Sequence, residues 1–464
     1  MNEADLSNKG KVPIVPGGKL FNGHLKEFRE DPLTFLNKAS RYGEVVKIRF
    51  GPLQNVYLIS NPELIKQVLV TKSKCFVKSK DFHALKPIIG EGLLTSEKET
   101  HMRQRRLIQP AFKRSHIINY GQDMIDISTD FVSKWEDGEE RILTQDMMSI
   151  TLGIISKTMF SLDFKEGYSI LGKPIETAMR VALKRMRTLL NLPLWIPTKT
   201  NLEYKDALDK LNKVLYSVID NRRKDQERHE DMLGILMDAR DDDHGIGMTD
   251  TQVRDEVMTI FLAGHETTAN AISWTFYLLS QYPEAQKKLF DEIDNVIGNR
   301  HPVPGDFMNL PYTQNIIWES LRIYPPAYIT GRQAEEDVQI GDYWFKKGDT
   351  IMVSQYVMHH KPEYFPDPET FRPERFENNF LKTIPAYAYF PFGGGPRVCI
   401  GNHFAFMEAV LILATISQRF KINLAQDHRP VIPFPSITLR PRGGLRMNLE
   451  ERNKQDRTDS NPSF

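Results

Sequence analysis

Hydrophobic positions along the chain follow two different periods, and the helical period dominates. Residues 45–50 and 55–60 alternate apolar and polar positions on either side of Gly51-Pro52, which is typical of two β-strands joined by a turn. From residue 62 to residue 420, most segments repeat their apolar residues every three to four positions, as amphipathic helices do. Between residues 338 and 353 the pattern becomes strand-like again. The pattern predicts a mainly α-helical fold with a small β region.

The clearest predicted helix begins after Thr249, which forms a capping box with Gln252. The helix is expected to run to about Gln281, because the nearby Pro283 cannot continue it; Pro283 instead opens a further helix that ends at Gly298. Near the middle of the long helix, residues 263–268 (AGHETT) place a glycine and two threonines, which are poor helix formers, in an apolar stretch.

Composition narrows the class of protein. The chain has 464 residues, 40% of them hydrophobic, and a mean hydropathy of −0.42, as expected for a soluble globular protein. Its formal net charge of +1 gives no electrostatic support for binding nucleic acid. Only two cysteines, Cys75 and Cys399, are present, which favours a reducing compartment. No signal peptide or bilayer-long apolar run is found, so we expect no membrane anchor and a cytoplasmic location.

The expected organisation is simple, because no internal repeat and no linker between domains are found. Residues 1–20 are predicted to be an extended N-terminal lead-in, rich in proline and glycine towards its end. Residues 21–450 are predicted to form a single domain. Residues 451–464 are predicted to be a polar, disordered tail.

The most informative segment of the chain surrounds Cys399, in Phe392–Gly401 (FGGGPRVCIG). Glycines allow a backbone to approach a flat ligand closely. A helical pattern starts just after the cysteine, and a helix N-terminus favours a thiolate. A thiolate held in this way can be the axial ligand of a haem iron, and Arg397 can pair with a haem propionate. The alternative is a small buried cysteine in a glycine-rich turn. A zinc site is disfavoured, because His403 is the single nearby candidate ligand and no second Cys/His pair completes the site.

This segment resembles the haem-binding loop of the cytochrome P450 family, in which Phe, Gly, Arg or His, Cys and a second Gly follow one another at these spacings. Ala405 and Glu408 continue the family pattern into the next helix. The resemblance implies a mainly α cytochrome P450 fold in which haem b (heme b, iron protoporphyrin IX) is buried between two long helices. It also implies a haem-thiolate monooxygenase, with Cys399 as the iron ligand and further haem contacts from Phe392, Gly393 and Ala263.

The segment at residues 263–268 matches the acid–alcohol pair of the same family. The resemblance implies that Glu266 supplies protons and that the hydroxyl of Thr267 handles them beside bound O2. Ala263 would leave room for O2 and the substrate. The alternative from the residues alone is a bent core helix, in which a buried threonine hydroxyl bonds back to a carbonyl.

Charged residues elsewhere match the structural and cofactor-binding positions of the family. Glu319 and Arg322 face one side of a helix, and the resemblance implies that they form a buried network with Arg375. Besides Arg397, the expected propionate partners are Arg332, Arg105 and His101. His101 stands where the family usually carries tryptophan. Its alternative is a solvent-facing helix residue.

The substrate pocket is expected to be mostly apolar, which favours a hydrophobic organic substrate. The family alignment predicts that its walls contain Leu94, Ala263, Thr267, Ala327, Tyr328, Ile329 and Ile437. Residues 192–197 (LPLWIP) either rim the entrance or form an apolar loop packed on the core. The chain is most similar to soluble bacterial members related to fatty-acid hydroxylases. Tyr57 matches their carboxylate-binding tyrosine, but Leu53 replaces the arginine, so terpenoids and steroid-like substrates fit equally well.

The sequence is therefore identified as that of a monooxygenase that inserts one oxygen atom from O2 by hydroxylation or epoxidation. No flavin or iron–sulfur motif is found, so electrons originating from NAD(P)H are expected to arrive through a ferredoxin or flavodoxin and its reductase. Lysine and arginine residues on the cysteine side are the expected docking surface. Two alternatives remain: a peroxide-driven peroxygenase or rearranging enzyme, and a non-catalytic haem-binding sensor or carrier.

Overall fold

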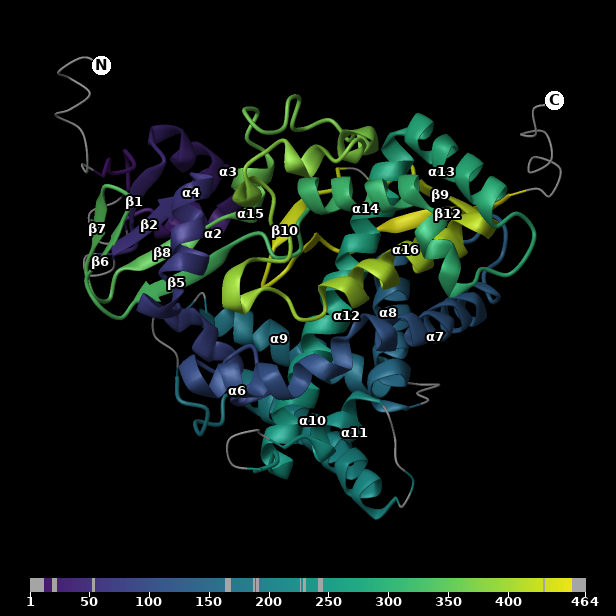
Figure 1. The fold of residues 1–464 in the computed structure, drawn as a ribbon, viewed down its shortest axis with the longest axis horizontal. Helices are drawn as coiled ribbons and strands as arrows, with labels where there is room; N and C mark the ends of the chain where they lie inside the picture. Colours follow the sequence, from purple (N-terminus) through teal and green to yellow (C-terminus); the bar gives the residue numbers. More distant parts are fainter. Residues whose placement is uncertain are drawn as a thin grey trace. The chain divides into compact units, whose positions relative to one another are not determined.

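The computed structural model describes residues 12–18, 23–51, 55–162, 168–186, 188, 192–225, 227, 231–240, 245–428 and 430–452 (Figure 1). Most of the predicted lead-in and nearly all of the predicted tail lie outside these residues. The chain forms two compact units. The first unit contains Met1–His83, Arg322–Thr370 and Asn378–Cys399, and the second contains Ala84–Leu321, Phe371–Glu377 and Ile400–Phe464. The chain passes repeatedly between them, so neither unit is one continuous stretch of sequence.

A five-stranded sheet forms the centre of the first unit, with its strands in the order β1-β2-β8-β5-β3. The strands are β1 (Val45–Arg49), β2 (Asn55–Ile59), β8 (Thr350–Val353), β5 (Thr330–Ala334) and β3 (Phe76–Lys78). The predicted hairpin is confirmed, because β1 and β2 pair antiparallel with Val45 opposite Ile59. The strand-like pattern at residues 338–353 is confirmed as well. It contains β8 and the hairpin of β6 (Val338–Ile340) and β7 (Tyr343–Phe345).

Both faces of this sheet are covered, as alternate residues of β2 show. Tyr57 and Ile59 belong to one apolar cluster, whereas Val56 and Leu58 belong to another. Successive side chains of a strand point to opposite faces, so the sheet lies between two cores. The helices of this unit are short: α2 (Leu25–Glu30), α3 (Pro32–Ala39), α4 (Pro62–Lys66) and α15 (Gln355–His359).

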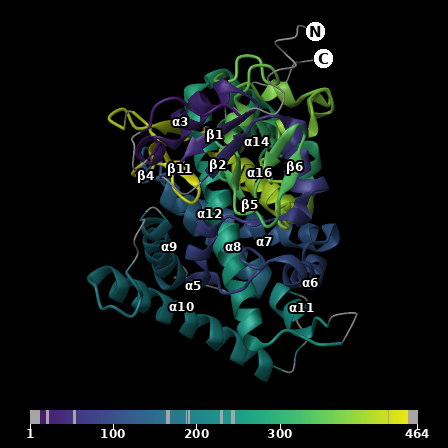
Figure 2. The same cartoon turned by 90° about the vertical axis from the view of Figure 1, so that its left-hand side faces the viewer.

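The second unit is built around one long helix, α12 (Asp250–Gln281), which packs along α8 (Leu143–Phe160) (Figure 2). Burial extends almost all round α12, as expected for a helix at the centre of a large core. The other helices of this unit are α5 (Lys86–Ile89), α6 (Lys98–Ile108), α7 (Arg114–Val132), α9 (Lys173–Met186), α10 (Lys199–Lys224), α11 (Met232–Asp238), α13 (Pro283–Val296), α14 (Pro311–Ile323) and α16 (Asn402–Arg419). At the end of α14 the chain passes to the first unit.

The sequence predicted both ends of α12. At its start, Thr249 N–H donates to Gln252 Oε1 at 2.9 Å and Gln252 N–H donates to Thr249 Oγ1 at 3.3 Å. This is the expected capping box. At its end the helix stops at Gln281, and Pro283 opens α13. The central segment of the second unit is therefore fixed by local chemistry at both termini.

Two small antiparallel sheets complete the second unit. One has the order β4-β12-β9 and consists of β4 (Glu140–Ile142), β12 (Arg446–Glu451) and β9 (Phe420–Leu424). The other pairs β10 (Pro433–Pro435) with β11 (Leu439–Pro441), and its connecting turn contains Ile437. None of the helices in the described ranges combines the length and the apolarity needed to cross a lipid bilayer.

Candidate active site

Cys399 ends a hydrogen-bonded turn in the first unit. Its backbone N–H donates to Phe392 O at 2.9 Å, and Val398 N–H donates to Gly395 O at 3.0 Å. Cys399 itself is exposed. An inert structural cysteine is usually buried like a small hydrophobic residue, so the alternative of a small buried cysteine is wrong. The turn holds the backbone of an accessible thiol in one place.

Gly395 is a residue of this turn at which any side chain would be strained. Its φ is +66°, in the left-handed region that glycine adopts freely. A Cβ at this position would also overlap the carbonyl oxygen of Leu69. The close approach fixes the turn against the neighbouring backbone of the same unit. An accessible thiol on such a turn, with the half-buried Phe392 and Gly393 before it, fits the thiolate-bound haem that the sequence implies.

Two of the expected propionate partners lie in the first unit. Arg332 lies on β5, opposite Ile351 of β8, and its guanidinium Nη1 donates to Gly331 O at 3.0 Å. Arg397 lies in the turn that precedes Cys399. Both side chains are half-buried. Two guanidinium groups are suitable donors for carboxylates because each presents several N–H groups in a planar fork.

Three predicted pocket residues precede β5 and differ in exposure. Ala327 is exposed, Ile329 is half-buried and Tyr328 is buried. The backbone of this segment is anchored, since Ser354 Oγ donates to Tyr328 O at 2.8 Å. Ala327 therefore offers accessible surface, whereas the Tyr328 side chain belongs to the interior of the unit.

In the second unit, α12 runs without a break through residues 263–268. Thr267 Oγ1 donates to Ala263 O at 2.7 Å, one turn earlier in the helix. Ala263 is exposed and Thr267 is half-buried, whereas the preceding Leu262 is 4% exposed. One face of an otherwise buried helix thus keeps accessible surface where the hydroxyl lies, which favours the pocket over a bent core helix.

Glu266 is held by a residue that the sequence reasoning missed. Thr438 Oγ1 donates to Glu266 Oε1 at 2.5 Å, and Asn270 Nδ2 donates to Thr438 Oγ1 at 3.1 Å. Thr438 follows Ile437 in the turn between β10 and β11, so the structure brings the predicted wall residue Ile437 to the same part of α12 as the predicted acid. No local motif reveals this contact, because the partners are 172 positions apart.

The predicted residues of α6 and the segment before it are also placed. His101 is 4% exposed, which makes its alternative as a solvent-facing residue wrong. Arg105 lies one turn later on the same helix, on the same face, and is half-buried. Leu94 lies half-buried between α5 and α6. His101 and Arg105 thus lie on one face of α6.

The three residues of the predicted network are all buried, and each makes hydrogen bonds within its own unit. In the second unit, Glu319 Oε1 accepts from Arg375 Nε at 3.4 Å and from Arg372 N–H at 3.0 Å. The side chains of Glu319 and Arg375 are 0% and 2% exposed. In the first unit, the buried guanidinium of Arg322 donates to backbone carbonyls, at 3.0 Å to His359 O and 2.7 Å to Pro368 O. Each buried charge is therefore compensated.

Two further buried ionisable groups lie on α12 and on the neighbouring α16. Burial raises the pKa of Glu408, on α16, well above its usual range. Burial lowers the pKa of His265, whose Nδ1 lies 2.5 Å from Phe261 O. His265 is thus a neutral core histidine bonded to its own helix. Glu408 entered the sequence reasoning only as part of the motif.

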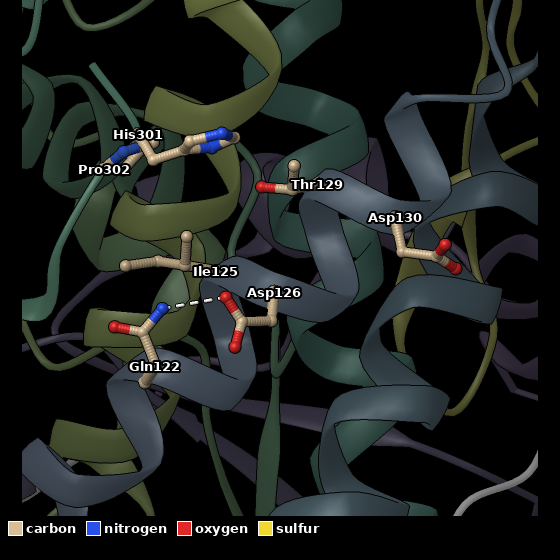
Figure 3. A pocket seen from close by; sticks show the side chains of 7 residues that line it. All are labelled: Gln122, Ile125, Asp126, Thr129, Asp130, His301 and Pro302. Atoms are coloured by element: carbon tan, nitrogen blue, oxygen red, sulfur yellow. Dashed lines mark hydrogen bonds between the residues drawn. The ribbon is translucent and has the colours of Figure 1, made fainter.

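Other surface features stand apart from these residues. A hollow of about 440 Å³ lies along one face of α7, where Gln122 Nε2 donates to Asp126 Oδ1 at 2.8 Å beside His301 and Pro302 (Figure 3). None of the predicted site residues lines it. In the segment 192–197, Trp195 is 81% exposed, so the alternative of a loop packed on the core is wrong for this residue.

Comparison with known proteins covers nearly the whole chain. A family model described as Cytochrome P450 matches residues 13–447. Cyclooctatin synthase of Streptomyces melanosporofaciens is 35% identical over 452 residues, which are 95% of this chain and 95% of that protein. Cyclooctat-9-en-7-ol 5-monooxygenase of the same organism is 33% identical, covering 92% of this chain and 90% of the relative. Pentalenene oxygenase of Streptomyces avermitilis is 33% identical, covering 96% of each.

Proposed function

Since the chain belongs to the cytochrome P450 family, we propose that it inserts one oxygen atom from O2 into a terpenoid, by hydroxylation or epoxidation. The family assignment makes it a haem-thiolate monooxygenase for hydrophobic substrates that receives electrons from a reductase system. The terpenoid class is a proposal, supported by relatives named for terpenoids and by the apolar residues predicted to line the pocket.

Two observations favour a terpenoid over a fatty acid. Tyr57, which aligns with a carboxylate-binding tyrosine, is 8% exposed and packs edge-on against Phe345 at 5.0 Å between ring centroids. The arginine that accompanies such a tyrosine is replaced by Leu53, which lies outside the described residues. A fatty-acid carboxylate would therefore lose its cation and would face a tyrosine that is already part of the core.

The exposed Cys399 thiol on its fixed turn is the observation that carries the proposal. We assign Cys399 as the axial ligand of haem b, and Arg397, Arg332, Arg105 and His101 as partners of its propionates. When bound, the haem supplies the reductive activation of O2. The protein fixes the orientation of this group through backbone hydrogen bonds and through cations placed on separate elements.

The proposed work of α12 is proton handling. Thr267 offers a hydroxyl on the accessible face of the helix, and Ala263 leaves space beside it. Glu266 is held one residue away by Thr438. We propose that Glu266 delivers a proton towards the Thr267 hydroxyl through water, while the bond from Thr438 to Oε1 restrains rotation of the Glu266 side chain. The Thr438 contact therefore controls how readily the Glu266 carboxyl rotates towards the Thr267 hydroxyl.

Electrons are proposed to originate from NAD(P)H and to reach the enzyme through a ferredoxin or flavodoxin with its reductase. Basic side chains on the cysteine side would attract such acidic carriers by complementary charge. The cytoplasmic location expected from the cysteine content stays a prediction. A comparison of turnover with peroxide alone and turnover supported by NAD(P)H and redox proteins tests this electron route against the peroxide-driven alternative.

The deciding experiment is the difference spectrum of the dithionite-reduced, haem-loaded protein with and without CO. A strongly red-shifted Soret band is expected for the wild type and for Cys75→Ala, and its loss is expected in Cys399→Ala. Cys75 is the matched control because it is the other cysteine of the chain. A red-shifted band that persists in Cys399→Ala would overturn the ligand assignment. Once the expected spectrum is obtained, terpenoid substrates are sought among compounds that shift the haem spin state of the wild type.

A further inference from the structure

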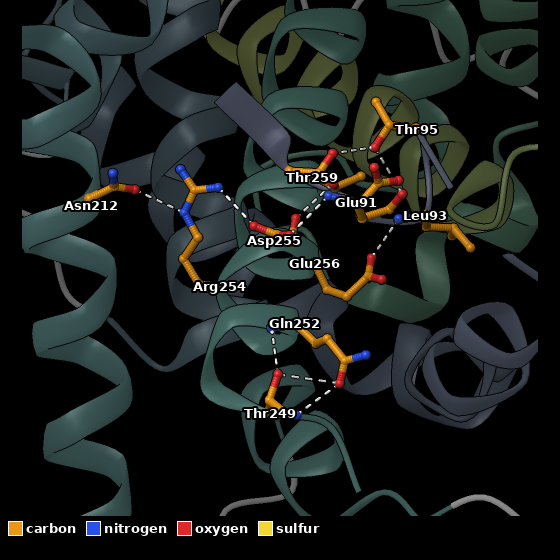
Figure 4. Close-up of polar contacts among 12 residues, drawn as sticks. Glu91, Leu93, Thr95, Asn212, Thr249, Gln252, Arg254, Asp255, Glu256 and Thr259 are labelled. Atoms are coloured by element: carbon orange, nitrogen blue, oxygen red, sulfur yellow. Dashed lines mark hydrogen bonds and ion pairs between the residues drawn. The ribbon is translucent and has the colours of Figure 1, made fainter. Parts of the chain in front are cut away.

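Glu256 carries a buried carboxyl that the proposed mechanism does not use. The residue lies on α12 and is 0% exposed. Its Oε2 accepts from Leu93 N–H at 2.8 Å, whereas its Oε1 has no hydrogen-bond partner within the described part of the chain (Figure 4). Leaving a buried polar atom without a partner costs about 1–3 kcal/mol. Such a cost needs an explanation.

Anchoring of the segment around Glu91 does not explain why a carboxyl is buried at Glu256, because Asp255 already anchors this segment. Asp255 Oδ2 accepts from Glu91 N–H at 2.9 Å, and its Oδ1 accepts from Arg254 Nη1 at 2.9 Å (Figure 4). Gly90 has a φ of +53°, and a Cβ there would overlap the Asp255 carboxyl. The segment is thus fitted closely around Asp255, whose two oxygens are both engaged. Glu256 adds a second contact to this segment through Oε2, and its Oε1 is not needed for anchoring.

The position of Glu256 on the helix points to the substrate. Glu256 and Thr267 are eleven residues apart, which brings them within about 20° of the same face of an α-helix. Ala263 lies on that face between them. The rise between Glu256 and Thr267 is about 16 Å along the axis. Glu256 also bonds to the residue before Leu94, another predicted wall residue. The carboxyl therefore lies at the far end of the face on which the oxidation is expected.

The protonation state of Glu256 decides what it can bind. The pKa of Glu256 is raised to about 8, chiefly by burial and also by the nearby charge of Asp255, while the hydrogen bond from Leu93 N–H partly offsets this rise. At neutral pH the group is mainly an uncharged acid, which can both donate and accept a hydrogen bond. A neutral hydroxyl is the complementary partner. An ammonium group would instead require the carboxylate.

We propose that Glu256 binds a hydroxyl group already present on the hydrophobic substrate, at the end of the molecule remote from the carbon that is oxidised. This inference rests on the proposed function and adds a polar subsite to it. It also gives the enzyme a place in a sequence of reactions: the preceding step must install a hydroxyl group, by an earlier oxygenation or by water capture of a carbocation.

The test compares matched ligands through the spin-state shift that binding produces. The probes are terpene alcohols and their parent hydrocarbons: borneol with bornane, cedrol with cedrane, and sclareol with labdane. The wild type is expected to favour at least one alcohol over its hydrocarbon. In Glu256→Leu the ratio of the two Kd values is expected to fall about tenfold, the effect of one hydrogen bond of about 1.4 kcal/mol. Glu256→Gln keeps a donor and an acceptor and is expected to retain the preference.

The pH dependence separates recognition from a structural role. In the wild type, alcohol binding is expected to weaken above about pH 8, where Glu256 ionises, whereas Glu256→Gln should show no such loss. Glu284→Gln makes the same chemical change at an exposed position of α13 and is the matched control. Equal losses for alcohol and hydrocarbon in Glu256→Leu would identify a structural role or a bound water and overturn the proposal. So would a panel in which no alcohol binds better than its hydrocarbon.

Failure of this inference can be told from failure of the proposed function. If the reduced CO complex lacks the red-shifted band, the haem-thiolate assignment fails whatever the ligands do. If that band is present in wild type and Glu256→Gln but neither protein discriminates alcohol from hydrocarbon, only the subsite is refuted. An amine that binds more tightly as pH rises from 6 to 8, while its own group stays protonated, would point to the carboxylate and would also refute the proposed hydroxyl.

Discussion

Replacing Glu319 by alanine should destabilise the second unit by several kcal/mol. Glu319 Oε1 accepts from Arg375 Nε and from Arg372 N–H, and both ionic side chains are almost completely buried. Removing one partner of a buried ion pair leaves the other charge uncompensated, which costs about 3–5 kcal/mol. Domains are stable by only about 5–15 kcal/mol in total. The variant is therefore expected to unfold at a clearly lower denaturant concentration and to retain less haem.

The assay is guanidinium unfolding followed by circular dichroism, together with the haem-to-protein ratio of the purified enzyme. Asp206→Ala is the matched control, because Asp206 pairs with Lys210 at 2.7 Å while both side chains are about 60% exposed. An exposed pair contributes about 1 kcal/mol or less. The double variant Glu319→Leu with Arg375→Met removes both charges and should recover most of the lost stability, because no buried charge is then left alone.

Two results would refute this reasoning. If Glu319→Ala unfolds at the same guanidinium concentration as Asp206→Ala, Glu319 does not compensate a buried charge. If the double variant is as unstable as Glu319→Ala, the loss arises from packing or from the Arg372 contact and not from the stranded guanidinium. If Glu319→Ala is destabilised but keeps its normal haem content, Glu319 contributes to folding stability and not to haem retention.

Three further predictions concern the active site and the helix that bears it. Thr267→Ala should lower product formed per NAD(P)H by about ten- to a hundredfold and release peroxide, because the hydroxyl handles protons; unchanged coupling would remove this role. Thr438→Val frees Glu266 from its 2.5 Å bond, so the coupling ratio should change, and identical solvent isotope effects in variant and wild type would contradict the contact. Glu256 has a folded pKa raised to about 8 from 4.5, so its stabilising contribution is present at low pH and is lost as pH rises between these values. Relative to Glu256→Gln, the wild type should therefore lose about 1.4 kcal/mol of unfolding free energy per pH unit between pH 5 and 8, and parallel stability curves would contradict the raised pKa.

Local chemistry explains what could be predicted from the sequence. The start of α12 follows from Thr249 and Gln252, and its end follows from Pro283, because caps and proline act over a few residues. The hairpin of β1 and β2 follows from a two-residue period around a turn. Cys399 was identifiable because glycines, arginine and cysteine stand at fixed spacings in one short segment. All these signals lie within a few neighbouring positions.

Contacts between distant positions explain what was missed. Thr438 looks like an ordinary turn residue, and only the folded chain brings it to Glu266. Glu256 looks like one more polar position in a helix, and only burial against the Leu93 backbone distinguishes it. His101 could be read as exposed or buried from its helical position, and packing decides for the interior. The family resemblance identified the predicted site residues, whereas the residues that contact and orient them could be found only in the folded structure.

The hydroxyl groups along α12 also affect how easily the backbone hydrogen bonds of that helix open locally. Three successive carbonyls lie within hydrogen-bond distance of a side-chain hydroxyl: Ala263 O of Thr267, Gly264 O of Thr268 at 3.2 Å, and His265 O of Thr151 of α8 at 3.0 Å. The Thr151 hydroxyl is shared with Met147 O, which lies 2.8 Å away. If the backbone amides that normally bond to these carbonyls detach, the carbonyls keep a partner. Opening the helix at this turn therefore costs less than opening it elsewhere. The amides of residues 267–269 should accordingly exchange hydrogen for deuterium faster than those one turn away on either side. Such a result would locate local opening at this turn of a helix that is otherwise buried on nearly every side.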